Sequence, residues 1–203
     1  MPHKRPIIPL LDEVDDDVAA IGACNTVVND GGALRGHNTD WKGALLALDE
    51  AGIEGLRTAV IVGAGGAAHA IAYALKQRGL RVSVAATPFA DAELLVRKMD
   101  LASALPLEEQ GSAGADIVVN ATPVAAVRLA AHERARVLLD VVPDGVRTEM
   151  VRQAERQGLR VAPGWRMLLH QAALQFTLYM EVPAPLQVME RSLLDVLVEQ
   201  GPA

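Results

Sequence analysis

The sequence predicts an α/β fold with a doubly wound parallel sheet, and two observations support this prediction. Short β-branched apolar runs alternate with longer helical stretches through the middle of the chain, which is typical of parallel strands joined by helical crossovers. Hydrophobic residues make up 51% of the 203 residues but aromatic residues only 3%. The core must therefore be built from Ala, Val and Leu, as in domains with buried parallel strands.

The central elements follow one another from residue 58. Residues 58–62 form a β-branched apolar run that predicts a buried strand, and an alanine-rich helix follows as far as Arg78, with Gly79 as its stop. The same patterns predict strands at 80–85, 116–120, 136–142 and 159–162, and helices at 90–99 and 148–157.

The flanking segments have a different organisation. Residues 9–18 predict a helix with Leu10, Leu11 and Val14 as its apolar stripe. Strands at 25–28 and 33–37 enclose a hairpin turn of the Asn-Asp-Gly-Gly type. The Asn-Thr-Asp segment at 38–40 is expected to cap a helix at 41–50, and two further helices are expected at 165–179 and 186–199.

Charge and composition exclude several classes of protein. A net charge of −6, from 19 Lys and Arg against 25 Asp and Glu, argues against binding to nucleic acid. The single cysteine, Cys24, excludes an intramolecular disulfide framework and a multi-cysteine metal site. The most apolar window, 59–75, is interrupted by glycines and a histidine and is too short to span a bilayer. The expectation is a cytoplasmic protein with no nucleic-acid or membrane partner.

A glycine-rich turn lies between the first central strand and its helix. In Gly63-x-Gly65-x-x-Ala68, the first glycine permits a tight turn, the second allows a pyrophosphate to approach the backbone, and the small third residue lets helix and strand pack. The helix N-terminus favours an anion at the same place. This pattern predicts a dinucleotide site of the Rossmann type. The alternative is a small-residue turn needed only for close packing.

The end of the second central strand leaves the choice of dinucleotide open. An acid at this point would bind the ribose hydroxyl of NAD, and an arginine would bind the 2′-phosphate of NADP. The chain has Ala86-Thr87-Pro88 here, which supplies neither group. The cofactor is therefore expected to be NADP or NAD.

Six segments, in order over nearly the whole chain, together resemble the shikimate dehydrogenase family. Residues 2–4 are similar to the family's lysine-bearing Pro-x-Lys segment, residues 21–28 to its Gly-Ala-x-Asn-Thr strand, and residues 36–43 to its Gly-x-Asn-Thr-Asp-x-x-Gly motif. Residues 62–67 are similar to its nucleotide loop, residues 120–122 to its Asn-Ala-Thr turn, and residues 164–172 to its Gly-x-x-Met-Leu-x-x-Gln-Ala helix. The family's activity is the reversible oxidation of shikimate to 3-dehydroshikimate, on the chorismate pathway to the aromatic amino acids, with hydride passed to a nicotinamide.

The resemblance also implies roles for individual residues. Lys4 and Asp40 would be the catalytic pair, and Asn25 and Gln171 would contact substrate hydroxyls. The residues expected to bind the cofactor are Gly63, Ala64, Gly65, Gly66, Ala67, Thr87, Asn120, Ala121, Thr122, Val142, Gly164 and Met167.

Each candidate also has a purely structural interpretation. Asp40 alone would most often be a helix cap, Asn25 a turn residue, and Gln171 a satisfied core amide. Lys4 alone would be a solvated tail residue. The remaining candidates, His37, His69, His170 and Cys24, are interpreted as structural, because the histidines lack metal-ligand spacing and the cysteine is expected to be a small buried apolar residue.

The chain departs from the family pattern at three places. Family members carry further strands and helices upstream of the lysine, with a Ser-x-Ser pair that binds the substrate, so the resemblance implies an N-terminally shortened chain with an incomplete substrate domain. The family's phosphate-binding Asn-Arg-Thr is replaced around Thr87, and its tyrosine is Pro143 here. The expected division is a partial substrate domain at 1–50, a dinucleotide domain at 51–164 and C-terminal helices at 165–203 that pack back on the substrate domain. Exposed strand edges would favour a homodimer.

Two other functions compete with a shikimate (or quinate-like) dehydrogenase. One is a non-catalytic or regulatory dinucleotide-binding relative that has lost substrate binding. The other is a different Rossmann enzyme, such as a folate-linked dehydrogenase, which the Asn-Thr-Asp and Met-Leu-x-x-Gln motifs disfavour.

Overall fold

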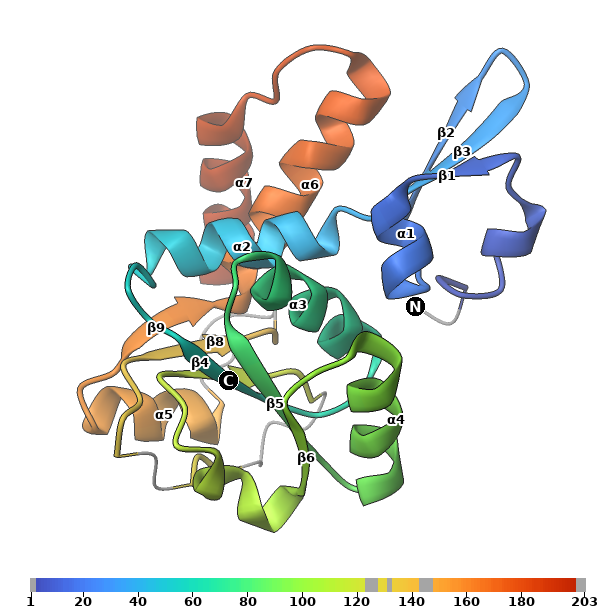
Figure 1. Ribbon diagram of the computed structural model, residues 1–203. Coiled ribbons are helices and arrows are strands. Elements are labelled where there is room, and N and C mark those ends of the chain that lie inside the picture. The colour runs from blue at the N-terminus through green and yellow to red at the C-terminus, as the bar shows by residue number, and fades with distance from the viewer. Residues whose placement is uncertain (1–2, 123–127, 131–132, 143–147, 200–203) are drawn as a thin grey trace.

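A six-stranded, wholly parallel sheet forms the centre of the molecule in the computed structural model, which describes residues 3–122, 128–130, 133–142 and 148–199 (Figure 1). The strand order is β6-β5-β4-β7-β8-β9. The strands are β4 (Thr58–Val62), β5 (Arg81–Ala86), β6 (Ser103–Pro106), β7 (Ile117–Asn120), β8 (Val137–Asp140) and β9 (Arg160–Pro163). The predicted fold class is confirmed.

Helices cover both faces of this sheet because successive strand residues point to opposite sides. Ala59 and Ile61 of β4 lie in one core, and Val60 and Val62 lie in the other. The first core is closed by α2 (Asp40–Glu50), α3 (Gly66–Gln77) and α4 (Phe89–Met99). The second is closed by α5 (Glu149–Arg156) and the 3-10 segment η2 (Leu107–Ala113).

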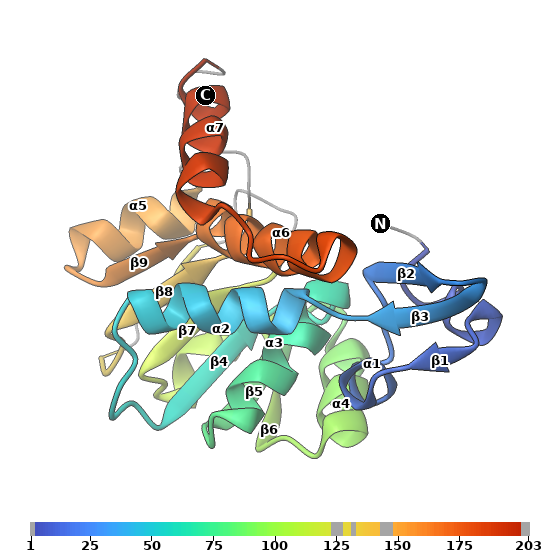
Figure 2. The ribbon, with the colours of Figure 1, turned by 90° about the horizontal axis from the view of Figure 1, so that it is seen from above.

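A small second sheet lies beside the central domain, with strand order β1-β3-β2 (Figure 2). Its strands are β1 (Glu13–Val14), β2 (Thr26–Asp30) and β3 (Ala33–His37), and helix α1 (Asp16–Ile21) follows β1. The predicted hairpin is confirmed: Gly31 and Gly32 both adopt positive φ, 59° and 104°, which the turn between β2 and β3 requires. Ile21 of α1 packs against Ala70 and Tyr73 of α3 and joins the two parts.

Helix α6 (Gly164–Met180) crosses α2 at close range, and α7 (Leu186–Glu199) packs against α6. Gly43 of α2 explains the close approach, since a Cβ at this position would lie 2.9 Å from the backbone nitrogen of Gln171 and from the carbonyl oxygen of Met167. Figure 2 shows α7 directed away from the central sheet. No helix in the described ranges combines the length and apolar character needed to cross a membrane.

The helix predicted at 9–18 is wrong. The chain instead forms a short 3-10 turn, η1 (Ile8–Leu10), then β1, then α1. The carboxylate of Asp12 accepts a hydrogen bond of 2.7 Å from the amide of Leu34, and β1 pairs with β3, so tertiary pairing overrides the helical spacing. Leu10 is 71% exposed and does not line a core.

Other differences concern boundaries and short elements. The sequence patterns did not predict β6 or η2, and β8 is shorter than the strand expected at 136–142. Helix α2 begins at Asp40, with Thr39 at the N-cap position and no side-chain capping bond. Asp40 is therefore not the cap, and its carboxylate is available for other partners. The division into domains at residues 50 and 164 stays a prediction.

Candidate active site

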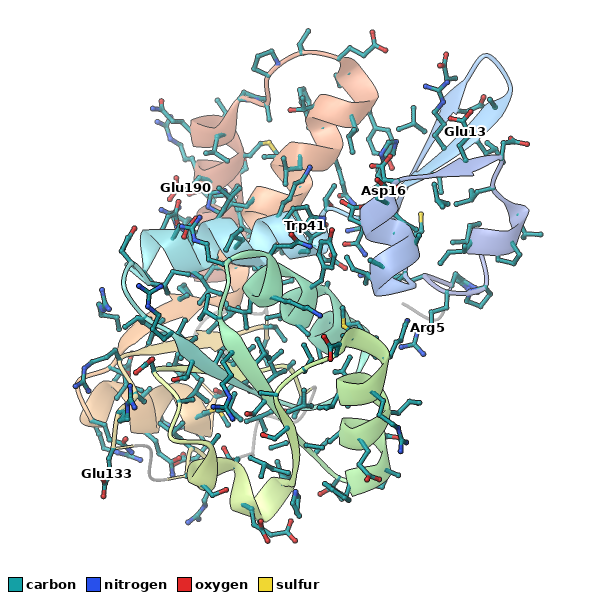
Figure 3. The ribbon with its side chains drawn as sticks, viewed as in Figure 1. Arg5, Glu13, Asp16, Trp41, Glu133 and Glu190 are labelled. Carbon is teal, nitrogen blue, oxygen red and sulfur yellow. The ribbon has the colours of Figure 1, made fainter. Side chains whose placement is uncertain are left out.

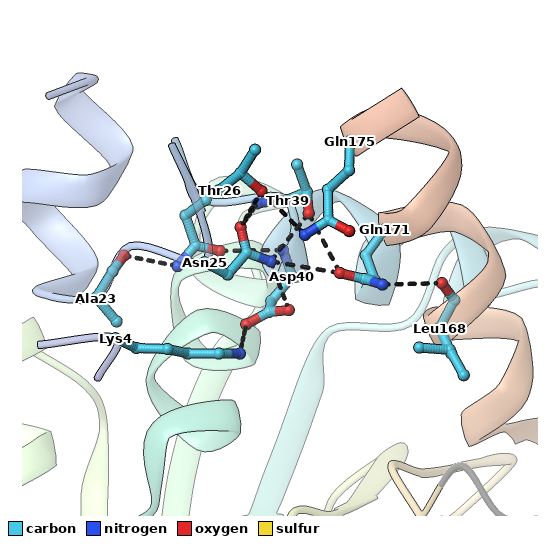
Figure 4. A network of polar contacts seen from close by, with 10 residues as sticks. Lys4, Ala23, Asn25, Thr26, Thr39, Asp40, Leu168, Gln171 and Gln175 are labelled. Atoms are coloured by element: carbon cyan, nitrogen blue, oxygen red, sulfur yellow. Dashed lines mark hydrogen bonds and ion pairs between the residues drawn. The ribbon is translucent and has the colours of Figure 1, made fainter. Parts of the chain in front are cut away.

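An ion pair between Lys4 and Asp40 lies where the small sheet meets α2 (Figure 4). The Lys4 Nζ is 2.6 Å from Oδ2 of Asp40, and the two side chains are only 28% and 12% exposed. The backbone of Lys4 is held as well, because its carbonyl accepts a hydrogen bond of 2.8 Å from the amide of Cys24. Lys4 is therefore not a solvated tail residue.

Asn25 donates a hydrogen bond to the second oxygen of the Asp40 carboxylate. Its Nδ2 donates to Oδ1 of Asp40 at 2.8 Å and to Oγ1 of Thr39 at 2.9 Å. Its Oδ1 accepts from the amide of Thr39 at 2.9 Å and from Oγ1 of Thr26 at 2.8 Å. Both oxygens of Asp40 are thus oriented by fixed donors.

Gln171 reaches this group from α6. Its Oε1 is 3.4 Å from both Asn25 Nδ2 and Thr39 Oγ1, and its Nε2 donates to the carbonyl of Leu168 at 3.2 Å. Contacts of 3.4 Å are at the weak end of the hydrogen-bond range. The amide oxygen is therefore held loosely enough to change partners when a ligand enters.

Two members of this network were not singled out from the sequence. Thr39 contributes both its amide and its hydroxyl, and Gln175 donates from Nε2 to Oγ1 of Thr26 at 3.0 Å. Gln175 follows Gln171 by four residues, which places both amides on one face of α6. This four-residue spacing from Gln171 is the feature of the sequence that could have identified Gln175.

The candidate cofactor residues lie at the carboxyl ends of the central strands, in the order of the sheet. Thr87 follows β5, and residues 63–67 follow β4. Asn120 ends β7 and is followed by Ala121 and Thr122. Val142 follows β8, and Gly164 opens α6 after β9. In doubly wound sheets, ligands bind at this edge, where the strand order reverses. Met167 continues the series one turn along α6, toward Gln171.

The glycine loop combines one glycine required for packing with two that face open space. Gly63 has φ of +106°, and a Cβ there would lie 3.0 Å from the carbonyl oxygen of Ala121. Nothing lies within 4 Å of the Cβ positions of Gly65 and Gly66. Close packing therefore does not explain the second and third glycines, whereas the approach of a pyrophosphate to the backbone does. The loop fits a dinucleotide.

A buried polar network supports the other end of this edge. Asn120 and Asp140 are 0% and 2% exposed, and the Nδ2 of Asn120 is 3.2 Å from Oδ1 of Asp140. The Asn120 Oδ1 accepts from the amide and hydroxyl of Thr122, and Asp140 accepts from the amide of Val142 at 3.1 Å. A Cβ on Gly164 would lie 2.7 Å from the carbonyl oxygen of Asp140. These contacts tie the three segments together; Pro143 lies outside the described residues.

The remaining candidates have local partners. Burial raises the pKa of the Cys24 thiol, which donates to the carbonyl of Thr26 at 3.1 Å. His37 and His170 contact Asp15 and Glu50 at 2.7 and 2.9 Å. His69 contacts Arg5.

Comparisons with known proteins agree with this geometry. Residues 164–194 match the family model of the shikimate 5'-dehydrogenase C-terminal domain. A shikimate dehydrogenase (NADP(+)) of Moorella thermoacetica is 38% identical over 216 residues, which cover 97% of this chain and 73% of the relative. Another from Alkaliphilus oremlandii is 33% identical over 95% of this chain and 75% of the relative.

Among solved structures, the shikimate 5-dehydrogenase of Thermus thermophilus in complex with NADP(H) and shikimate superimposes with a TM-score of 0.87 at 33% identity, covering 97% of this chain and 77% of that one. The quinate dehydrogenase of Corynebacterium glutamicum in complex with NAD gives 0.85 at 31% identity, covering 96% and 75%. The comparisons give no support to a non-catalytic relative. The chain belongs to the shikimate dehydrogenase family, whose enzymes are oxidoreductases that act on a CH–OH group.

Proposed function

We propose that this chain interconverts shikimate and 3-dehydroshikimate, with NADP as the hydride partner. The observation that carries the proposal is the Lys4–Asp40 ion pair, whose two partners come from segments 36 residues apart. It lies beside two side-chain amides, and α6 connects it to the edge where the glycine loop lies.

The dinucleotide would be held along the sheet edge. The backbone of residues 63–67 and the N-terminus of α3 would receive the pyrophosphate, and residues 120–122, Val142, Gly164 and Met167 would border the nicotinamide. When bound, the nicotinamide supplies the hydride acceptor for oxidation and the hydride donor for reduction.

The Lys4–Asp40 pair would handle the proton. In the oxidation, the neutral amine form of Lys4 would accept the proton of the substrate hydroxyl while the C–H hydride leaves, so the carbinol becomes a ketone and Lys4 becomes the ammonium that pairs with Asp40. In the reduction, the Lys4 ammonium returns a proton to the ketone oxygen. Asp40 orients Lys4 through Oδ2, and its Oδ1 is fixed by Asn25, so the amine has a defined direction.

Asn25 and Gln171 would recognise the substrate hydroxyls. The weak 3.4 Å contacts of Gln171 can be exchanged for a substrate hydroxyl at little cost. A site that leaves such amides unpaired with the wrong ligand discriminates against analogues that lack the hydroxyl.

NADP is proposed over NAD because the Moorella relative is named for NADP and the Thermus structure contains NADP(H). Thr87, at the end of β5, would lie next to the adenosine ribose. NAD is retained as the comparison cofactor, since the Corynebacterium quinate dehydrogenase was solved with it.

The test is the appearance of reduced nicotinamide with shikimate and, separately, with quinate, each with NADP and with NAD. We expect turnover with shikimate and NADP to exceed the other three combinations. Quinate or NAD as the better substrate or cofactor would correct the specificity, and the absence of turnover in all four would overturn the proposal.

A further inference from the structure

A contact between the N-terminal segment and the nucleotide loop has no part in the mechanism above. Arg5 directly follows Lys4, and its Nη2 lies 3.0 Å from Nε2 and 3.5 Å from Nδ1 of His69 on α3, so the guanidinium lies against the face of the ring. The other ring nitrogen of His69, Nδ1, lies 3.0 Å from the carbonyl oxygen of Gly65. Figure 3 shows Arg5 at the boundary between the N-terminal segment and the central domain.

The partners of the ring define its protonation. The carbonyl oxygen of Gly65 can only accept a hydrogen bond, so the proton of His69 must lie on Nδ1, which donates it to Gly65. The cationic guanidinium of Arg5, which lies against the ring near Nε2, disfavours a second proton there. Burial, together with the neighbouring charges of Arg5 and Lys98, lowers the pKa of His69 against the raising effect of the Gly65 carbonyl. The neutral imidazole is therefore the form that bridges the two groups.

The segment that carries Lys4 is thus fixed from two sides. The carbonyl of Lys4 is bonded to the amide of Cys24, in the small sheet's half of the molecule. The next side chain, Arg5, contacts His69, which is only 7% exposed and is bonded to the carbonyl of Gly65 in the glycine loop. The backbone next to Lys4 is therefore linked to the glycine loop by a chain of two side-chain contacts.

We propose that Arg5 and His69 are positioning residues, which join the nucleotide loop to the Lys4 segment and set the place of the Lys4 amine relative to the bound dinucleotide. This inference rests on the proposed function for the roles of Lys4 and the loop. It assigns His69 a task beyond the structural role expected from the sequence.

The kinetic test removes each end of the bridge. His69→Ala removes the ring that contacts Arg5 and donates to Gly65, and Arg5→Met removes the guanidinium. We expect either change to lower kcat about tenfold and the Kd of NADP to change less than about twofold, because displacement of a catalytic group affects the chemical step. The double variant should lose no more than the worse single variant, since both act through one contact.

Two matched variants separate positioning from general damage. His69→Gln keeps an acceptor for Arg5 and should recover most of kcat. Lys76→Met, on the same helix but bonded to the carbonyl of Met99, should behave as the unmodified chain. Additive losses in the double variant, or losses that His69→Gln does not reduce, would overturn the bridge.

A second measurement does not depend on turnover. Acylation of Lys4 by an amine reagent, followed by peptide mass spectrometry with Lys42 as internal reference, reports how firmly the Lys4 amine is held. We expect His69→Ala and Arg5→Met to accelerate Lys4 labelling several-fold, as local opening becomes easier. Equal labelling in all variants would overturn the inference. Absence of turnover in the unmodified chain, together with accelerated labelling, would instead reject the proposed function and retain the bridge.

Discussion

The two halves of the candidate site are built in opposite ways. Around Asp40, side chains from four segments are already bonded to one another, with both carboxylate oxygens occupied. Around Gly65, the site is formed by backbone atoms, and the space in front of the Cβ positions of Gly65 and Gly66 is open. The substrate half therefore depends on side chains that are held in place by hydrogen bonds, and the nucleotide half depends on the absence of side chains from its glycines.

This difference separates the effects that substitutions should have. In the substrate half, deletion of a functional group should affect the chemical step and spare the cofactor. In the nucleotide half, addition of atoms to a glycine should weaken cofactor binding but leave kcat at saturating cofactor nearly unchanged.

The largest expected effect is that of Asp40→Asn. The amide keeps the size of the side chain but removes the negative charge that orients the Lys4 amine. We expect kcat for shikimate oxidation to fall by about 10²–10⁴-fold, the usual contribution of a positioned acid–base group, with the Kd of NADP unchanged. Steady-state kinetics measure kcat, and displacement of fluorescent NADPH by NADP measures the Kd of NADP. Equal losses of both would reduce Asp40 to a structural role.

Glycine substitutions test the nucleotide half and should come next in size. Gly65→Val fills space that is empty in the structure, so we expect NADP binding to weaken by about 10²-fold or more with little change in the thermal midpoint, since the added atoms meet only the ligand. Gly63→Val is the matched variant, because its positive φ and its 3.0 Å approach to Ala121 should cost about 1–3 kcal/mol of stability as well. A large loss of stability in Gly65→Val would show that this glycine serves packing.

Gly43→Ala should affect the substrate half through helix packing, because it pushes α6, which carries Gln171, away from α2. The new Cβ would lie 2.9 Å from the backbone of Gln171, so α6 must move by a few tenths of an ångström or more. We expect a destabilisation of about 1–3 kcal/mol and a higher KM for shikimate, with the Kd of NADP less affected. Leu46→Ala, at a 41% exposed position on α2, is the control and should cost less than about 0.5 kcal/mol. An unchanged KM would indicate that Gln171 does not contact the substrate.

The nucleotide half could be predicted almost entirely from local sequence. A β-branched run, a glycine turn and an alanine-rich helix are contiguous in the chain, so 58–77 contains all the information needed to place the loop. The order of the remaining residues at the sheet edge then follows from the topology of a doubly wound sheet.

The substrate half could not be assembled in this way. Lys4 and Asp40 are 36 residues apart, and Asn25 and Gln171 are 146 apart, so only the family resemblance suggested that they meet. The Arg5–His69 contact, across 64 residues, had no signal in the sequence. The first helix was misplaced for the same reason, because pairing of β1 with β3 and the bond from Leu34 to Asp12 are long-range events.

The smallest expected effect concerns Thr87, where neither local pattern nor geometry distinguishes NADP from NAD. Thr87→Arg places a guanidinium at the end of β5, where a ribose 2′-phosphate would lie. A charge-assisted hydrogen bond contributes about 1.5–3 kcal/mol, so the ratio of NAD to NADP dissociation constants should rise by about tenfold or more. Thr87→Gln adds length without charge and should leave that ratio near its original value. If both variants leave the ratio unchanged, the adenosine ribose does not lie against β5, and the phosphate must be bound by another strand end of the same edge.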